Sequence, residues 1–134
     1  MKVNGLDGKK HAFPPSGYMP DNDDQRQRSS LHLRARKILK RLYPTNRVLE
    51  EVPLPGTGGL FADFYLPERK IMVECNGEQH YKFNAHFHGT RLNFMRAKAN
   101  DRRKREWCEL NNIYFVELPY NEDDNEWEHR IKLG

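Results

Sequence analysis

Two acidic residues stand inside neighbouring hydrophobic runs that are joined by a short turn. Residues 61–66 and 71–74 are mainly apolar and flank the Pro-Glu-Arg-Lys sequence at 67–70, a pattern that predicts a β-hairpin. Asp63 lies in the first run and Glu74 ends the second. A carboxylate on a core-facing strand is costly unless another group pairs with it. Two such carboxylates on one hairpin therefore predict a divalent metal ion and hydrolytic chemistry.

The composition predicts one intracellular domain. The 134 residues are enough for a single core, and the mean hydropathy is -0.98. No apolar run approaches the roughly 20 residues that a membrane-spanning helix needs, so we expect no membrane contact. The first residues lack the apolar stretch of a secretory signal. We therefore expect Cys75 and Cys108 to be reduced thiols rather than a disulfide.

Basic residues are concentrated in two blocks, whereas the acidic residues gather near the C-terminus. The net charge is +4, and two cationic segments on so small a domain predict a polyanion such as a phosphate backbone. The alternative is that these residues only solvate helix surfaces. The candidate phosphate-binding residues are Arg34, Lys37, Lys40 and Arg41 in the first block and Arg102 and Arg103 in the second.

Periodicity predicts an alternation of helices and strands. We expect a helix from Ser29 or Ser30 to before Pro44, strands at 47–53, 61–66 and 71–74, a helix over 90–111 and a strand over 113–118. That order predicts an α/β fold with a mixed sheet of about four strands flanked by helices.

Neither end of the chain shows a long periodic pattern. Residues 1–28 contain several glycines and prolines and a polar run, so they predict a flexible N-terminal arm. Residues 122–134 predict an acidic C-terminal tail, in which a short helix near Trp127 is an alternative. The expected domain is therefore 29–121.

The hairpin and its surroundings carry a family resemblance. Asp63 followed by Glu74-Cys75-Asn76 resembles the PD-(D/E)XK nuclease superfamily. The longer string, which continues through Gly-Glu-Gln-His-Tyr81, is similar to a small phage and bacterial branch akin to very-short-patch-repair and homing-type endonucleases. The likeness covers about residues 29–121. It implies a restriction-endonuclease-like sheet and a protein of the cytoplasm of a bacterium or a phage-infected cell.

The resemblance also implies a metal site and an activity. Asp63, Glu74 and the backbone carbonyl of Cys75 would hold Mg²⁺, or Mn²⁺, and the protein would be an endonuclease that hydrolyses DNA. Asn76 stands at the superfamily's lysine position, where it can form hydrogen bonds but carries no charge. A catalytically degraded nuclease fold that serves as a DNA- or protein-binding module is therefore the alternative function.

Residues elsewhere are candidates for the missing charge and for proton transfer. Gln79 and His80 are candidates to orient or deprotonate water, since histidine titrates near pH 6.5. If the helix over 90–111 packs on the sheet, Lys104 supplies the missing positive charge and Asp101 approaches the site. The alternative for Asp101 is an ion pair with a neighbouring arginine of the same helix. Glu51 is an auxiliary candidate, but strand parity does not decide between it and the residue before it.

Several questions stay open at this stage. The histidines from His80 to His88 raise the question of a zinc site, although the sequence lacks four zinc ligands at recognisable spacings. The sequence does not distinguish DNA from RNA as the substrate. A single-site nuclease cuts both strands of a duplex as a homodimer or by acting twice, and no interface can be recognised.

Overall fold

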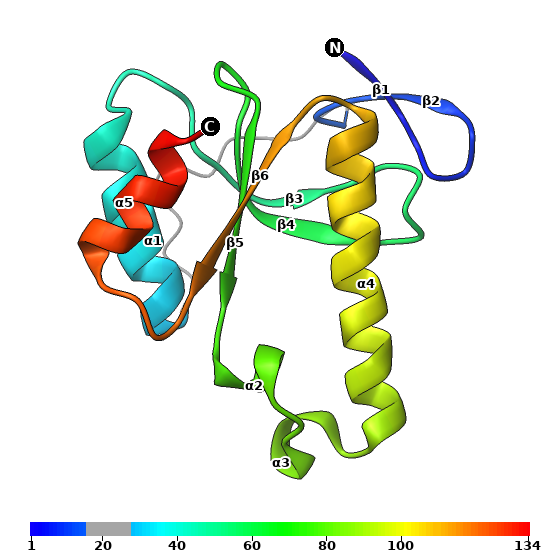
Figure 1. Ribbon diagram of the computed structural model, residues 1–134. Coiled ribbons are helices and arrows are strands. Elements are labelled where there is room, and N and C mark those ends of the chain that lie inside the picture. Colours follow the sequence, from blue (N-terminus) through cyan, green and yellow to red (C-terminus); the bar gives the residue numbers. More distant parts are fainter. Residues whose placement is uncertain (16–27) are drawn as a thin grey trace.

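A four-stranded mixed sheet with helices on both faces makes up the fold (Figure 1). The computed structural model describes residues 1–15 and 28–134. In sheet order the strands are β3 (Leu49–Pro53), β4 (Phe61–Leu66), β5 (Ile71–Asn76) and β6 (Tyr114–Pro119). The pairs β3–β4 and β4–β5 are antiparallel, whereas β5 and β6 are parallel. The predicted α/β class with a mixed sheet of about four strands is confirmed.

Two long helices have the caps that their sequences predict. The helix α1 (Ser30–Leu42) begins after Ser29, whose side chain accepts a hydrogen bond from the backbone N–H of His32. The helix α4 (Arg91–Leu110) begins after Thr90, which caps it in the same way. Parallel strands need a crossover connection, and α4 lies within the connection from β5 to β6. The short helices α2 (Glu78–Tyr81) and α3 (Ala85–His88) precede α4 in this crossover.

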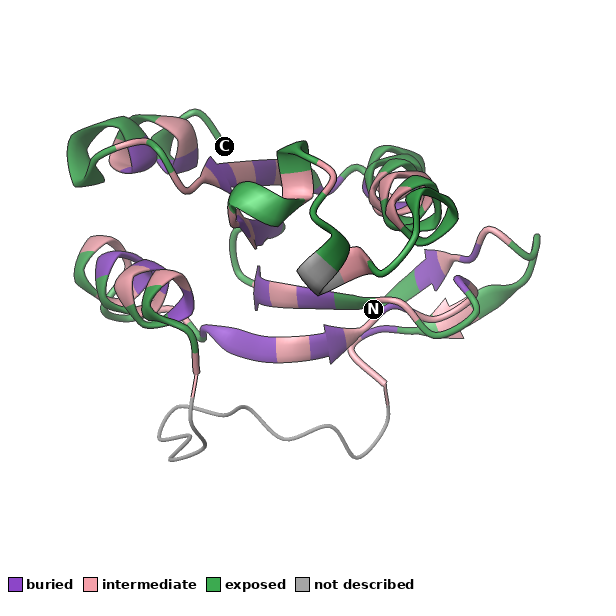
Figure 2. Cartoon of the chain, turned by 90° about the horizontal axis from the view of Figure 1, so that it is seen from below, coloured by how far each residue is buried: buried purple, intermediate pink, exposed green. Residues whose placement is uncertain are grey.

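Two hydrophobic clusters fix the helices on opposite faces of the sheet. One contains α1 and α5 (Asp124–Lys132) packed on apolar side chains of β4, β5 and β6. The other contains Trp107 and Cys108 of α4 packed on Tyr65 and Met72. Buried residues are concentrated along the strands, as Figure 2 shows. The alternation of side chains along a strand therefore decides which helix each residue meets.

The N-terminal prediction is wrong for residues 1–15. The strands β1 (Lys2–Asn4) and β2 (Lys10–Ala12) form an antiparallel hairpin, and Phe13 is buried after them. The Phe13 ring lies 4.8 Å from the Tyr65 ring and 5.0 Å from the Trp107 ring, measured between centroids. The start of the predicted arm at 1–28 therefore belongs to the core, and its residues 16–27 lie outside the described residues.

The predicted boundary at residue 122 is also wrong. Trp127 and Ile131 of α5 are fully buried in the cluster with α1. The acidic residues serve the start of this helix, because Asp123 and Glu126 form a reciprocal capping box. The segment 122–134 is therefore an integral helix of the domain, which agrees with the alternative of a short helix near Trp127.

Candidate active site

The hairpin register brings the two carboxyl groups together. In the β4–β5 ladder Phe64 pairs with Val73, so Asp63 and Glu74 take the next opposed positions and face the same side. The Asp63 carboxylate is close enough to Glu74 to raise the pKa of that carboxyl group. Asp63 Oδ2 also accepts the backbone N–H of Cys75 at 2.9 Å. The predicted approach of Asp63 to Glu74 is confirmed.

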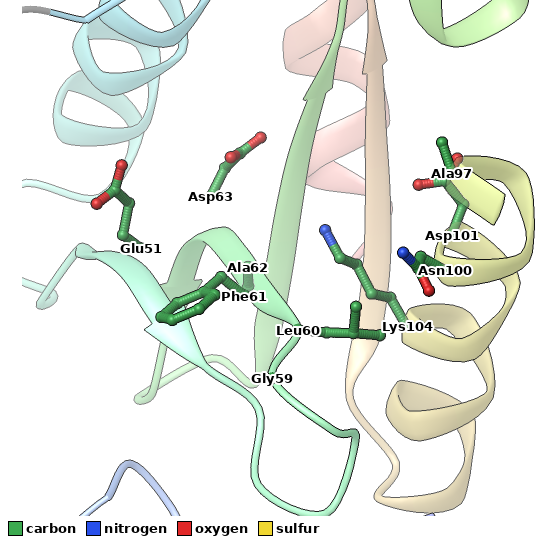
Figure 3. Close-up of a pocket in the computed structure, with 10 residues that line it drawn as sticks. All are labelled: Glu51, Gly59, Leu60, Phe61, Ala62, Asp63, Ala97, Asn100, Asp101 and Lys104. Atoms are coloured by element: carbon green, nitrogen blue, oxygen red, sulfur yellow. The ribbon is translucent and has the colours of Figure 1, made fainter. Parts of the chain in front are cut away.

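Lys104 reaches this pair from the helix that covers the same face. Its Nζ lies 3.1 Å from Oε1 of Glu74, and Figure 3 shows its side chain directed from α4 toward the strands. Lys104 is largely buried, so water screens the contact only partly. Lys104 therefore lies beside Glu74, as expected for an α4 that packs on the sheet, and its role in supplying the missing charge stays a prediction.

The carboxyl pair is short of positive charge. Burial raises the pKa of Glu74 well above its ordinary value, and the nearby Asp63 carboxylate raises it further. Lys104 opposes this rise without cancelling it. Ionising both carboxyl groups here is therefore unfavourable until another cation arrives, and hard oxygen atoms in this arrangement suit Mg²⁺ or Mn²⁺. The donor set fits the implied metal ion.

His80 and Asp101 form a second acidic–basic pair at the site. His80 Nε2 lies 3.0 Å from Asp101 Oδ2, which joins α2 to α4. Burial lowers the pKa of His80 below its ordinary value, although Asp101 acts in the opposite direction. Burial likewise raises the pKa of Asp101. The predicted approach of Asp101 to the site is confirmed, and the alternative pairing with a neighbouring arginine is not what holds it.

Gln79 lies apart from the carboxyl pair. It is exposed, and its side chain folds back over Gly77, where a Cβ would meet Gln79 Oε1 at 2.7 Å. Glycine at this position therefore leaves room for the amide. In this conformation Gln79 does not contact Asp63 or Glu74, so a role in orienting water stays a prediction.

Asn76 belongs to a neighbouring network that the sequence reasoning missed. It is buried on the same face as Glu74, where it acts to lower the pKa of the Glu117 carboxyl group and of the Tyr81 hydroxyl. The Tyr81 hydroxyl donates a hydrogen bond to Glu117 Oε1 at 2.5 Å, and Arg105 forms an ion pair with the same carboxylate. The signal was available, because Glu117, like Glu74, stands inside an apolar strand.

An open pocket of about 560 Å³ joins these elements (Figure 3). Asp63, Asp101, Lys104 and Glu51 line it. Glu51 has a φ of 49°, a left-handed backbone conformation that costs a non-glycine residue about 1 kcal/mol or more. With this kink Glu51 lines the pocket, while Glu50 is buried elsewhere, and strand parity alone did not decide between them.

Two of the predicted phosphate-binding residues have structural roles instead. Arg34 pairs with Asp124 at 2.5 Å and lies 3.7 Å from the centre of the Trp127 ring. Arg41 pairs with Glu128. Both arginines thus hold α5 against α1, on the face of the sheet opposite the pocket. Both side chains are thus paired within the protein, and their binding to a phosphate backbone stays a prediction.

The other predicted cations divide between the two faces. Lys37 and Lys40 lie on α1, the former exposed and the latter half-buried. Arg102 is exposed on α4, close in sequence to the site residues of that helix. Arg103 donates a hydrogen bond to the Thr57 carbonyl at 2.5 Å, which ties α4 to the loop before β4. Among these candidates, Arg102 and Arg103 belong to α4, the helix that contributes Asp101 and Lys104 to the pocket.

Two findings bear on metals and membranes. Within the part of the chain that the structure describes, no three His, Cys, Asp or Glu residues are grouped as a metal-binding cluster. Across residues 1–15 and 28–134 no helix has the length and apolar character to cross a membrane.

The curated relatives that match the chain are viral proteins. Over 69 residues the chain is 42% identical to the uncharacterized protein 307L of Invertebrate iridescent virus 6, a match that covers 52% of this chain and 35% of that protein. Over 68 residues it is 37% identical to the uncharacterized protein 033L of Invertebrate iridescent virus 3, covering 51% and 34%. Over 74 residues it is 35% identical to the uncharacterized protein 094L of Frog virus 3, covering 54% and 48%.

The chain thus spans between about a third and a half of the length of these relatives. No family model and no solved structure matches it. The similarity therefore connects the chain with viral proteins, and the chemistry has to be argued from the site itself.

Proposed function

We propose that the protein is a metal-dependent endonuclease that hydrolyses phosphodiester bonds in DNA, with Mg²⁺ or Mn²⁺ as its cofactor. The observation that carries this proposal is the Asp63–Glu74 carboxyl pair with Lys104 at 3.1 Å, in an open pocket. Two carboxylates, water and a substrate phosphate are a typical environment for Mg²⁺. The carbonyl of Cys75, whose N–H already binds Asp63, is the proposed third protein oxygen.

Each residue of the site has a distinct chemical task. When bound, the metal ion lowers the pKa of its water and offsets charge on the phosphate. Lys104 adds a positive charge on the other side of Glu74, where it stabilises the negative charge that develops during attack. His80, whose lowered pKa keeps its ring neutral near pH 7, accepts a proton from the attacking water. Asp101 orients the His80 ring from α4.

The DNA backbone is proposed to lie along α4. Arg102 is exposed on this helix. Lys98 Nζ lies 5.4 Å from the centre of the ring of Tyr81, the last residue of α2. A duplex or single strand held there presents its phosphates to the pocket. Affinity that rests on such contacts weakens steeply as salt concentration rises.

Cleavage of supercoiled plasmid tests this function. Wild-type protein with Mg²⁺ or Mn²⁺ should convert the plasmid to nicked or linear forms, and chelation should abolish the conversion. Asp63→Asn and Glu74→Gln keep the side-chain shapes and should abolish it as well. Undiminished cleavage by both variants would contradict the assignment of the site. Loss of cleavage in both variants, with cleavage retained in the surface variant Glu109→Gln, would support it.

A binding module without catalytic activity is the second candidate function. Asn76 stands at the superfamily's lysine position and carries no charge, and it lies close enough to Glu117 and Tyr81 to lower the pKa of both groups. Retained, salt-sensitive DNA binding with no cleavage of DNA or RNA under any divalent metal would favour this module. Cleavage of RNA but not DNA would instead reassign the substrate.

The viral relatives support a place of action. Their similarity to the chain suggests that the protein works in a virus-infected host cell. Detection of the protein in infected but not in uninfected cells, with an antibody raised against it, tests this proposal.

A further inference from the structure

A second open pocket, of about 580 Å³, borders the candidate active site across α2. His80 of α2 contacts Asp101 in the first pocket, whereas Tyr81, the next residue, lines the second. The other walls come from the end of β6, from the turn after it, which contains Tyr120, and from Arg130 near the end of α5. We call this second site the tyrosine pocket. No step of the proposed hydrolysis uses it.

Two tyrosine rings, held by separate contacts, form one side of the tyrosine pocket. The rings of Tyr81 and Tyr120 lie 6.1 Å apart between centroids and are tilted by 39°. Tyr81 is held by its hydroxyl, which donates to Glu117 at 2.5 Å. Tyr120 is held by its backbone N–H, which donates to the Asn76 carbonyl at 2.9 Å. Both rings are therefore positioned from the β5–β6 strand pair, and Tyr81 is still 37% exposed.

The charged groups of the tyrosine pocket have partners of opposite charge within the protein, among them Lys82, which is exposed and lies 3.7 Å from Glu78. Arg130 makes two hydrogen bonds to the Glu122 carboxylate, at 2.6 and 2.7 Å. Glu117 is neutralised by Arg105. The lining thus offers aromatic faces and balanced charges, which suit an uncharged flat ring better than a phosphate group. Nucleobases meet this requirement and stack on tyrosine whatever their sequence.

Building on the DNA-cleaving function proposed above, we propose that the tyrosine pocket binds an unpaired nucleobase of the strand that enters the active site. A base inside a duplex has both faces covered by its stacked neighbours, so only an unpaired or extruded base can lie on Tyr81 or Tyr120. The substrate class is therefore DNA with an unpaired nucleotide at the cleavage point, such as a gap, a flap or a bulge, rather than continuous duplex. Tyr81 and Tyr120 are the specificity-determining residues.

A binding experiment without metal separates this inference from catalysis. Fluorescence anisotropy in EDTA would compare three labelled probes of one sequence: a continuous duplex, the same duplex with one unpaired nucleotide, and that duplex with an abasic site at the unpaired position. Wild-type protein should bind the unpaired base on the order of tenfold more tightly than the abasic probe. Tyr120→Ala should remove this preference, Tyr120→Phe should keep it, and Tyr114→Ala, a change at an exposed tyrosine near the start of β6, is the matched control.

The outcomes distinguish failure of the pocket from failure of the proposed function. Equal affinity of wild-type protein for the base and abasic probes would overturn the inference, and this comparison requires no variant to fold. A preference that survives Tyr120→Ala unchanged would overturn it too. If the protein prefers the unpaired base but cuts no substrate, base binding in the tyrosine pocket stands and the nuclease function is overturned. If the protein cuts DNA without any preference for the base, the nuclease function stands and base binding in the tyrosine pocket is overturned.

Discussion

Two buried glutamates of the same sheet differ in how completely their charge is satisfied. Glu50 accepts hydrogen bonds from His32 at 2.6 Å and from Arg36 at 2.7 and 2.8 Å. Burial raises its pKa, but these partners outweigh burial and the net pKa is lowered. At Glu74 burial and Asp63 both raise the pKa, and Lys104 alone opposes them.

The difference separates a structural charge from a functional one. A buried ion that its own protein satisfies contributes to holding the fold, and removing one partner is strongly destabilising. A buried carboxyl group whose pKa is raised and whose neighbour is another carboxyl group is typical of a site that awaits a ligand. We therefore assign Glu50 to the α1 face as a structural residue and Glu74 to the candidate active site.

The largest expected effect is on catalysis at Glu74. Glu74→Gln removes a carboxylate oxygen of the proposed metal site, so the plasmid cleavage rate should fall on the order of 10³-fold. The free energy of unfolding in urea should stay equal or rise, because glutamine is neutral in a place where a carboxylate is unfavourable. A variant that unfolds more easily than wild type, or that cleaves at the wild-type rate, would remove the distinction between the two glutamates.

The reverse result is expected at Glu50. Glu50→Gln leaves His32 and Arg36 without their common carboxylate, so the free energy of unfolding should fall by roughly 3 kcal/mol. Cleavage per folded molecule should change little, since this cluster lies on the other face of the sheet. Urea titration followed by tryptophan fluorescence measures the loss. Glu109→Gln, an exposed change on α4, is the control and should leave stability unaltered.

A smaller catalytic effect is expected at Lys104. Lys104→Met keeps the length of the side chain but removes the charge beside Glu74, so cleavage should slow by about 10²-fold. Lys132→Met, an exposed change on α5, should leave the rate unaltered. If both methionine variants cleave equally fast, Lys104 does not take over the role proposed for a lysine at the position of Asn76.

The smallest effect is a pH dependence with opposite signs for the two glutamates. A lowered pKa stabilises the folded state above the ordinary value of 4.5, so the stability that Glu50 contributes is lost as pH falls below 4.5. A raised pKa acts in reverse, so in metal-free protein the stability linked to Glu74 is lost as pH rises above 4.5. The difference in unfolding free energy between Glu74→Gln and wild type should therefore grow from pH 4.5 upward. A constant difference would contradict the raised pKa.

Local patterns predicted most of the central fold. The hairpin strands, α1, α4 and β6 begin and end within a few residues of the predicted limits, because each has a clear apolar period and a cap, a glycine or a proline at its end. The approach of Asp63 to Glu74 followed from hairpin pairing alone. The approach of Lys104 required only that α4 pack on the sheet.

The missed features depend on contacts between distant parts of the chain. The strands β1 and β2 have three residues each, too few for a visible period, and Phe13 is fixed by Tyr65 and Trp107 far along the sequence. The sequence predicted that Arg34 binds phosphate, because it could not show that α5 places Asp124 beside it. Glu51 lines the pocket with a left-handed φ, a backbone conformation that no side-chain pattern reveals.

Binding of Mn²⁺ to the metal-free protein tests the central claim most directly. Isothermal titration should detect one Mn²⁺ ion per chain for the wild type, and this binding should be lost in both Asp63→Asn and Glu74→Gln but kept in Glu50→Gln. Absence of binding to the wild type, or equal binding by all four proteins, would contradict the assignment of Asp63 and Glu74 as the metal site.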